Sequence, residues 1–132
     1  MLQVNRAHLM HKQQIMIKPF AGTAIFFAVL MSSCALHSTT TIPSSERFLL
    51  GNNTHRSFRV KLKNVSAGEI EIHRAPIAGG RHSGQTIQPG QRVRMRVEEN
   101  TALVITNNSP AEASVELVVK GDTGLLMGYT KN

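Results

Sequence analysis

The feature that most constrains the fold of this chain is an alternation of apolar and polar residues that begins near residue 57. Apolar side chains occupy every second position in four segments, 58–63, 69–73, 92–97 and 114–119. Successive side chains of a β-strand point to opposite faces, so a period of two predicts strands with one buried and one solvated face. The continuous apolar run of residues 103–105 predicts a strand covered on both faces. Residues 125–127 would form a last, weaker strand.

Turn-forming residues separate these segments. Gly, Pro and Asn gather in the stretches 64–68, 79–84, 89–90, 107–110 and 121–124. Pro89 followed by Gly90 suits a type II turn, in which the proline presets φ and the glycine takes a positive φ. No helical period of useful length follows residue 55. Six or seven short strands spaced about ten residues apart predict an all-β fold, a small antiparallel β-sandwich or barrel over residues 56–132. Its expected core includes Val60, Ile72, Val93, Met95, Ile105 and Leu117.

The N-terminal part of the chain contains a different kind of segment. Residues 20–31 are uncharged and mostly apolar, and Arg6, Lys12 and Lys18 precede them. A helix of this length would span about 18 Å, well short of the roughly 30 Å of a bilayer core. A short apolar run behind basic residues is typical of a secretory signal peptide. A start at Met16 instead of Met1 would leave a shorter basic lead, and both starts stay open.

The apolar run ends in Leu30-Met31-Ser32-Ser33-Cys34, and Cys34 is the only cysteine of the chain. This run resembles the lipobox of bacterial lipoproteins, although that family usually has Leu where this chain has Met31. The resemblance implies that Cys34 is acylated and that the signal peptide, residues 1–33, is removed before it. Ala35 follows the cysteine, which in enterobacterial lipoproteins implies sorting to the outer membrane. Ordinary cleavage after Ala35, giving a soluble secreted protein, and an uncleaved anchor are the alternatives.

Residues 34–55 have the composition of a flexible tether. They are rich in Ser, Thr, Gly and Asn, and such a stretch buries too little apolar surface to order itself. The exception is Phe48-Leu49-Leu50, which could dock on the domain as an edge segment. The expected organisation is therefore a signal peptide over 1–33, a lipidated tether over 34–55 and a β-domain over 56–132.

The charges of the domain gather in two basic ladders. The chain has 15 Lys and Arg against 8 Asp and Glu, and three of the cations precede residue 34. The ladders place three cations each on one face of a strand: Arg59, Lys61 and Lys63, and Arg92, Arg94 and Arg96. If the two strands are neighbours, the ladders form one cationic face for an anionic polymer or lipid headgroups. The alternative is a solvated face that Glu69, Glu71, Glu112 and Glu116 neutralise from adjoining strands.

Other chemistry finds little support in the sequence. Residues 75–84 form the longest predicted strand connection, where Arg81 and His82 could contact a ligand. Four histidines follow Cys34, at positions 37, 55, 73 and 82, but their spacing lacks the regularity of a metal site, so we expect them at the surface. No arrangement of carboxylates, or of serine with histidine, indicates catalysis. We therefore expect no metal, no cofactor and no enzymatic activity.

These observations predict a non-enzymatic, lipid-anchored protein at the outer membrane, facing the periplasm, with a role in binding or assembly. Its expected partners are the membrane, through lipidated Cys34, and an envelope protein or an anionic polysaccharide. An anionic-polymer-binding or carbohydrate-binding module that uses the basic ladders is the first alternative. A small periplasmic enzyme or inhibitor is the second. Nucleic acid is not an expected partner, because few aromatic side chains are available to stack on bases.

Overall fold

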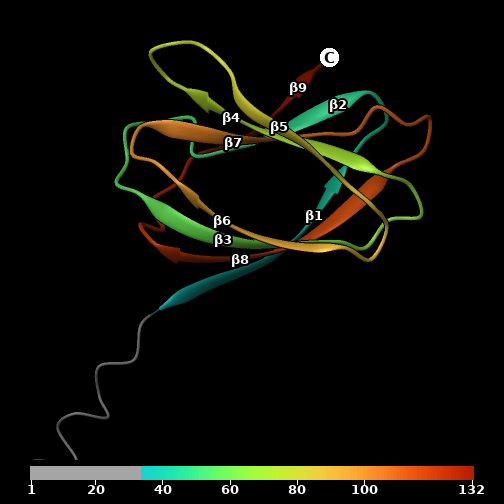
Figure 1. Ribbon diagram of the computed structural model, residues 1–132, viewed down its shortest axis with the longest axis horizontal. Coiled ribbons are helices and arrows are strands. Elements are labelled where there is room, and N and C mark those ends of the chain that lie inside the picture. The colour runs from blue at the N-terminus through green and yellow to red at the C-terminus, as the bar shows by residue number, and fades with distance from the viewer. Residues whose placement is uncertain (1–33) are drawn as a thin grey trace, which may run out of the picture. The chain divides into compact units, whose positions relative to one another are not determined.

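The computed structural model describes residues 34–132, and the predicted signal peptide with Met1 and Met16 lies outside the described residues. This part of the chain forms nine β-strands (Figure 1). They are β1 (Ala35–Ile42), β2 (Glu46–Leu50), β3 (Phe58–Asn64), β4 (Ile70–Pro76), β5 (His82–Ile87), β6 (Arg92–Val97), β7 (Thr101–Thr106), β8 (Ala113–Gly121) and β9 (Met127–Lys131). Within residues 34–132 there is no helix that could cross a membrane.

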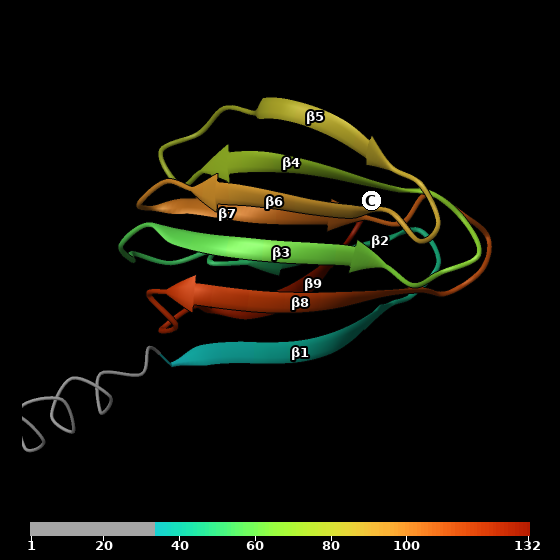
Figure 2. The same ribbon diagram turned by 60° about the horizontal axis from the view of Figure 1, so that its bottom comes forward.

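The strands form two antiparallel sheets that pack face to face. One sheet has four strands in the order β1-β8-β3-β6, and the other has five in the order β5-β4-β7-β2-β9. Figure 1 shows the sheets as two layers, and Figure 2 shows β6, β3, β8 and β1 running side by side. The predicted all-β fold, an antiparallel β-sandwich or barrel, is confirmed. The described residues contain nine strands, more than the six or seven predicted.

The core lies between the two sheets and follows the alternation in the sequence. Phe58, Val60 and Leu62 of β3 are buried, and the intervening cations face outward. Leu103, Val104 and Ile105 of β7 are all buried, which confirms a strand covered on both faces. Of the six core positions predicted, Val60, Ile72, Ile105 and Leu117 are buried. Val93 and Met95 are only partly buried, because β6 is an edge strand of its sheet.

The predicted tether over residues 34–55 is wrong, because this segment forms β1 and β2. β1 pairs with β8 along its whole length, and β2 lies between β7 and β9. Ile42, Phe48 and Leu50 are at most 3% exposed and belong to the core. The Thr residues of β1 are β-branched and suit an edge strand whose outer face is polar. The β-domain therefore starts at β1 rather than at residue 56.

The connections between strands agree with most of the predicted turns. Gly90 takes a φ of 77°, as a type II turn at Pro89-Gly90 requires. The predicted connection over 75–84 is shorter than expected, since β4 continues to Pro76 and β5 starts at His82. β5 was not predicted, because its sequence lacks a clear apolar alternation. The last strand covers 127–131 rather than 125–127.

Two buried asparagines stabilise loops at one end of the sandwich. Asn64 donates to the carbonyl oxygens of Gly68 and Ile87, at 2.8 and 3.0 Å. Asn107 donates to the carbonyl oxygen of Ala111 at 2.8 Å and to two more carbonyls at the end of β1. Both asparagines also accept a backbone N–H from the serine two residues later. These side chains satisfy loop carbonyls that the sheets leave without a donor.

Candidate anion-binding face

The two predicted basic ladders lie on neighbouring strands. β3 and β6 pair antiparallel, so that Arg59 lies opposite Arg96, Lys61 opposite Arg94, and Lys63 opposite Arg92. Because the alternate residues of both strands point into the core, all six cations project from the outer face of the four-stranded sheet. The condition under which the ladders would form one surface is therefore met.

A third strand extends this surface with a residue that the sequence reasoning missed. β8 pairs with the other side of β3 and places Lys120 opposite Arg59. The signal was present, since Lys120 continues the alternation beyond Val119, but it could not be connected to a ladder without knowing the strand order. The cationic face is defined here as Arg59, Lys61, Lys63, Arg92, Arg94, Arg96 and Lys120.

Of the four glutamates expected to neutralise the cations from adjoining strands, only one lies beside the cationic face. Glu116 lies on β8 opposite Lys63. Glu71 belongs to β4 in the other sheet, and Glu112 lies in the loop before β8. Glu69 lies just before β4 and accepts a hydrogen bond from Gln88 at 3.2 Å. The outward positions of β3, β6 and β8 therefore carry seven cations and one carboxylate.

The cations of this face are solvated rather than paired. Six of the seven are exposed and Lys63 is half-buried. None of the seven forms an ion pair with a carboxylate of residues 34–132. The one side-chain hydrogen bond among them is a 3.3 Å contact from the Arg96 guanidinium to the Ser57 hydroxyl. Like charges that face one another across a sheet repel, so this arrangement opposes folding slightly and attracts anions.

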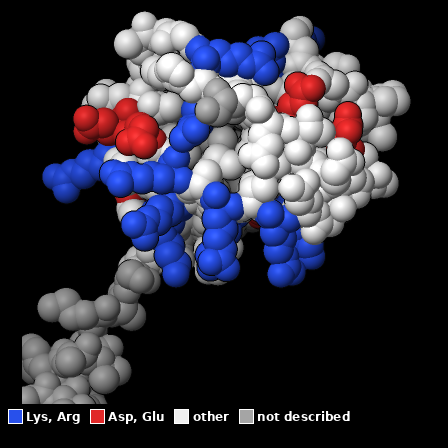
Figure 3. Space-filling view, in the orientation of Figure 1, with Lys and Arg blue, Asp and Glu red and all other residues white. Residues whose placement is uncertain are grey.

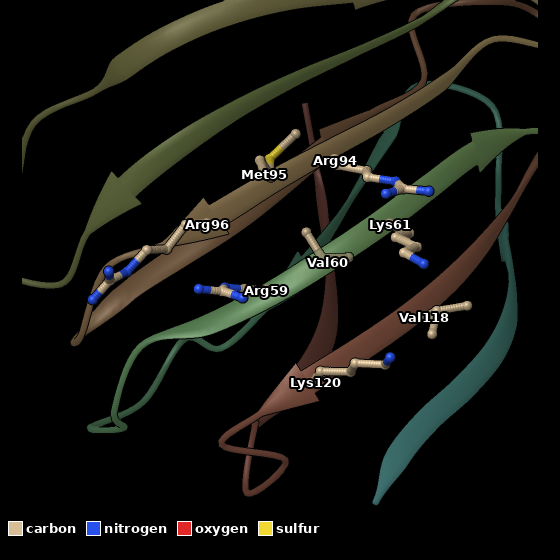
Figure 4. Close-up of a pocket in the computed structure, with 8 residues that line it drawn as sticks. All are labelled: Arg59, Val60, Lys61, Arg94, Met95, Arg96, Val118 and Lys120. Atoms are coloured by element: carbon tan, nitrogen blue, oxygen red, sulfur yellow. The ribbon is translucent and has the colours of Figure 1, made fainter. Parts of the chain in front are cut away.

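The surface between the cations is hollowed. A shallow hollow of about 420 Å³ lies among Arg59, Lys61, Arg94, Arg96 and Lys120, with the half-buried Val118 between the charged side chains (Figure 4). A second hollow of about 260 Å³ continues it toward Lys63, Arg92 and Glu116. Figure 3 shows cationic side chains gathered along the side of the molecule that the four-stranded sheet forms. The face thus offers several separated cations around a small apolar patch.

The remaining predicted site residues lie elsewhere. Arg81 precedes β5, and His82 is its first residue, so both belong to the edge of the five-stranded sheet and not to the cationic face. Cys34 is exposed, has a free thiol and directly precedes β1. Within residues 34–132, no three His, Cys, Asp or Glu side chains gather as metal ligands would.

Two of the four histidines are buried, which corrects the expectation that all lie at the surface. The His55 ring contacts two backbone carbonyl oxygens, of Arg56 at 2.6 Å and of Thr101 at 2.9 Å. His73 is 9% exposed, and its Nδ1 has no hydrogen-bond partner among the described residues. The His55 ring lies 5.2 Å from the Phe58 ring, and sequence spacing cannot distinguish such a buried histidine from an exposed one.

Two titratable groups have shifted pKa values. Burial lowers the pKa of His73, the nearby charges of Arg81 and Arg47 lower it further, and Glu71 opposes them. Backbone N–H groups of Arg56 and then Gly124 donate to the Asp122 carboxylate and lower its pKa. Asp122 therefore holds the loops beside β3 and β8, and neither group belongs to the cationic face.

Comparison with known proteins supports the fold. No protein-family model matches the sequence, and no curated protein matches it significantly. Among solved structures, the chain is similar to an uncharacterized conserved protein with a double-stranded β-helix domain from Klebsiella pneumoniae. The two are 15% identical, with a TM-score of 0.50 over 74% of this chain and 76% of that one.

Two more distant similarities add no argument about function. The capsular polysaccharide assembling protein CapF from Staphylococcus aureus is 12% identical, with a TM-score of 0.47 over 68% of this chain and 25% of CapF. The Yersinia pseudotuberculosis-derived mitogen is 15% identical, with a TM-score of 0.42 over 72% of this chain and 96% of the mitogen. At 15% identity, the similarity to the Klebsiella pneumoniae protein supports the all-β sandwich or barrel fold and nothing finer.

Proposed function

We propose that this protein is a lipid-anchored, non-enzymatic component of the bacterial envelope whose β-sandwich binds an anionic partner. The observation that carries the proposal is the cationic face, with seven cations on three adjacent strands and a single carboxylate among them. Opposite-charge pairs across strands are a common way to stabilise a sheet, and three pairs of β3 and β6 here have like charges instead. A binding role explains this placement better than stability does.

The proposed anchor is Cys34, acylated and N-terminal after removal of residues 1–33. It rests on the resemblance of residues 30–34 to a lipobox, and the exposed, free thiol at the start of β1 is compatible with it. Ala35 in the next position supports the outer membrane as the destination, with the β-sandwich facing the periplasm.

The binding role is tested with two matched double variants. Lys61→Gln/Arg94→Gln removes two opposed charges from the centre of the face, and Arg47→Gln/Lys131→Gln removes two exposed charges from the five-stranded sheet. On an anionic polysaccharide matrix, the first variant should elute at distinctly lower salt than the wild type, and the second should elute close to it. Retention should weaken as salt rises, because exposed charges are screened. Equal losses in both variants would mean that net charge alone controls retention and would contradict the proposal.

The anchor is tested separately by Cys34→Ser. The wild-type protein should fractionate with membranes and show an acylated N-terminal cysteine by mass spectrometry, and the variant should leave the membrane fraction. A mature N-terminus at Leu36 would indicate ordinary signal-peptidase cleavage and remove the anchor from the proposal.

A further inference from the structure

Cys34 lies close to the cationic face, and this restricts which partners the face can bind when Cys34 is attached to a membrane. Cys34 is one residue from Ala35, which pairs with Lys120 of β8. Lys120 pairs in turn with Arg59, and Arg59 with Arg96. Strands lie about 4.8 Å apart, so this row of three cations lies within about 15 Å of the start of β1.

No flexible linker separates Cys34 from the four-stranded sheet. A flexible tether of about 20 residues would hold the domain roughly 25 Å from its anchor. Here the first residue after Cys34 is already part of β1 and hydrogen-bonded into the sheet. Consecutive Cα atoms are 3.8 Å apart, so an acylated Cys34 would hold the end of the four-stranded sheet at the membrane surface.

The charges of the face are unevenly distributed in a way that fits this placement. The end near Cys34 carries Arg59, Arg96 and Lys120, with no carboxylate in the paired row. The far end carries Lys63 and Arg92, with Glu116 opposite Lys63. The outer face of β1 adds no carboxylate, since its sequence contains none. On the outer face, the row of cations nearest Cys34 therefore has no carboxylate, while Glu98, Glu99 and Asp122 lie in the turns beyond its strands.

We propose that the anionic partner of the cationic face is the headgroup layer of the membrane that holds Cys34, so that the four-stranded sheet lies on the leaflet. This inference rests on the lipid anchor of the proposed function and names the partner of the same face. A basic surface adds to membrane attachment by acyl chains, because each Lys or Arg near an anionic leaflet contributes electrostatic attraction. Val118, half-buried among the cations, adds a small apolar area to the surface that would face the headgroups.

The lysines of the chain provide a direct test. Lys61, Lys63 and Lys120 belong to the face, and Lys131 lies on β9 at the edge of the other sheet. The lipidated protein is reconstituted in phosphatidylglycerol-rich vesicles or in phosphatidylcholine vesicles, acetylated with an amine-reactive ester, and analysed by mass spectrometry. We expect the three face lysines to be several-fold less acetylated on the anionic vesicles, with the strongest protection at Lys120. Lys131 should react equally on both.

Two further arms identify the origin of any protection. Adding 0.5 M NaCl should restore acetylation, because the Debye length then falls to a few ångströms. The Lys61→Gln/Arg94→Gln variant should lose protection at Lys120, and Arg47→Gln/Lys131→Gln should keep it. At a roughly fivefold change in membrane affinity per cation, two substitutions weaken contact with the leaflet on the order of 30-fold.

The outcomes separate this inference from the proposed function. Equal acetylation of the face lysines on both vesicle types would contradict the proposed contact with headgroups. Protection that appears only when an anionic polysaccharide is added would also contradict it, and would identify the polysaccharide as the partner of the face. If mass spectrometry finds Cys34 without acyl chains, the anchor of the proposed function fails instead. Coupling this sole cysteine to a maleimide lipid in the same vesicles then tests the headgroup contact independently, and unprotected lysines in that state overturn it.

Discussion

Because the cationic face places like charges opposite one another, reversing one of them should stabilise the fold. Arg94→Glu converts the Lys61–Arg94 pair from repulsive to attractive. Two unit charges about 7 Å apart in water interact by roughly 0.6 kcal/mol, so the reversal contributes about 1 kcal/mol at low salt. For a domain of this size, 1 kcal/mol raises the Tm by about 4–8 °C.

The measurement is thermal unfolding followed by circular dichroism in 10 mM and 500 mM NaCl. The Debye length is about 30 Å in 10 mM salt and only a few ångströms in 500 mM, so most of the difference between the two proteins should vanish at high salt. The wild-type Tm should itself rise with salt as repulsion across β3 and β6 is screened. Arg94→Gln should lie between the wild type and Arg94→Glu.

A mirror-image control lies on the five-stranded sheet. Lys131 of β9 lies opposite Glu46 of β2, an opposite-charge pair. Lys131→Glu makes this pair repulsive and should lower the Tm at low salt, in contrast to Arg94→Glu. If Arg94→Glu leaves the low-salt Tm unchanged or lowers it, or if the wild-type Tm does not depend on salt, the cations of the face do not repel one another and the electrostatic argument is wrong.

Two other predictions concern the fold itself. A chain that starts at residue 55 loses Ile42, Phe48 and Leu50 from the core. Emptying each such site costs about 2–5 kcal/mol against a total stability of about 5–15 kcal/mol, so its circular dichroism spectrum should be that of an unfolded protein. A folded β spectrum would mean that β1 and β2 are dispensable. The lowered pKa of His73 means that the folded state binds its proton less readily than the unfolded state, whose value is near 6.5. Its contribution to stability is therefore present above pH 6.5 and declines as the pH falls below it. Urea unfolding between pH 7.5 and 5 should show less pH dependence in His73→Gln than in the wild type, and identical slopes would rule His73 out as a source; the lowered pKa of Asp122 acts only below its ordinary value of 3.8.

The sequence by itself determined which residues of several strands face the core and which face water. This could be predicted because the pleat of a β-strand sends alternate side chains to opposite faces wherever the strand lies in the sheet. The burial of Val60 and Leu117 and the exposure of Lys61 and Arg94 follow from that local geometry. Pro89-Gly90 likewise specifies its turn locally, through the φ preferences of the two residues.

Only the tertiary structure decided which strands are neighbours. β3 and β6 pair although β4 and β5, which lie between them in the chain, belong to the other sheet. That pairing joins the two ladders, adds Lys120 from β8 and leaves most of the predicted glutamate partners elsewhere. The strand β1 is also a tertiary outcome, since its Ser- and Thr-rich sequence lacks an apolar alternation and is ordered by pairing with β8. Strand order and register arise from contacts between residues far apart in the chain, and a pattern within a single strand carries no information about them.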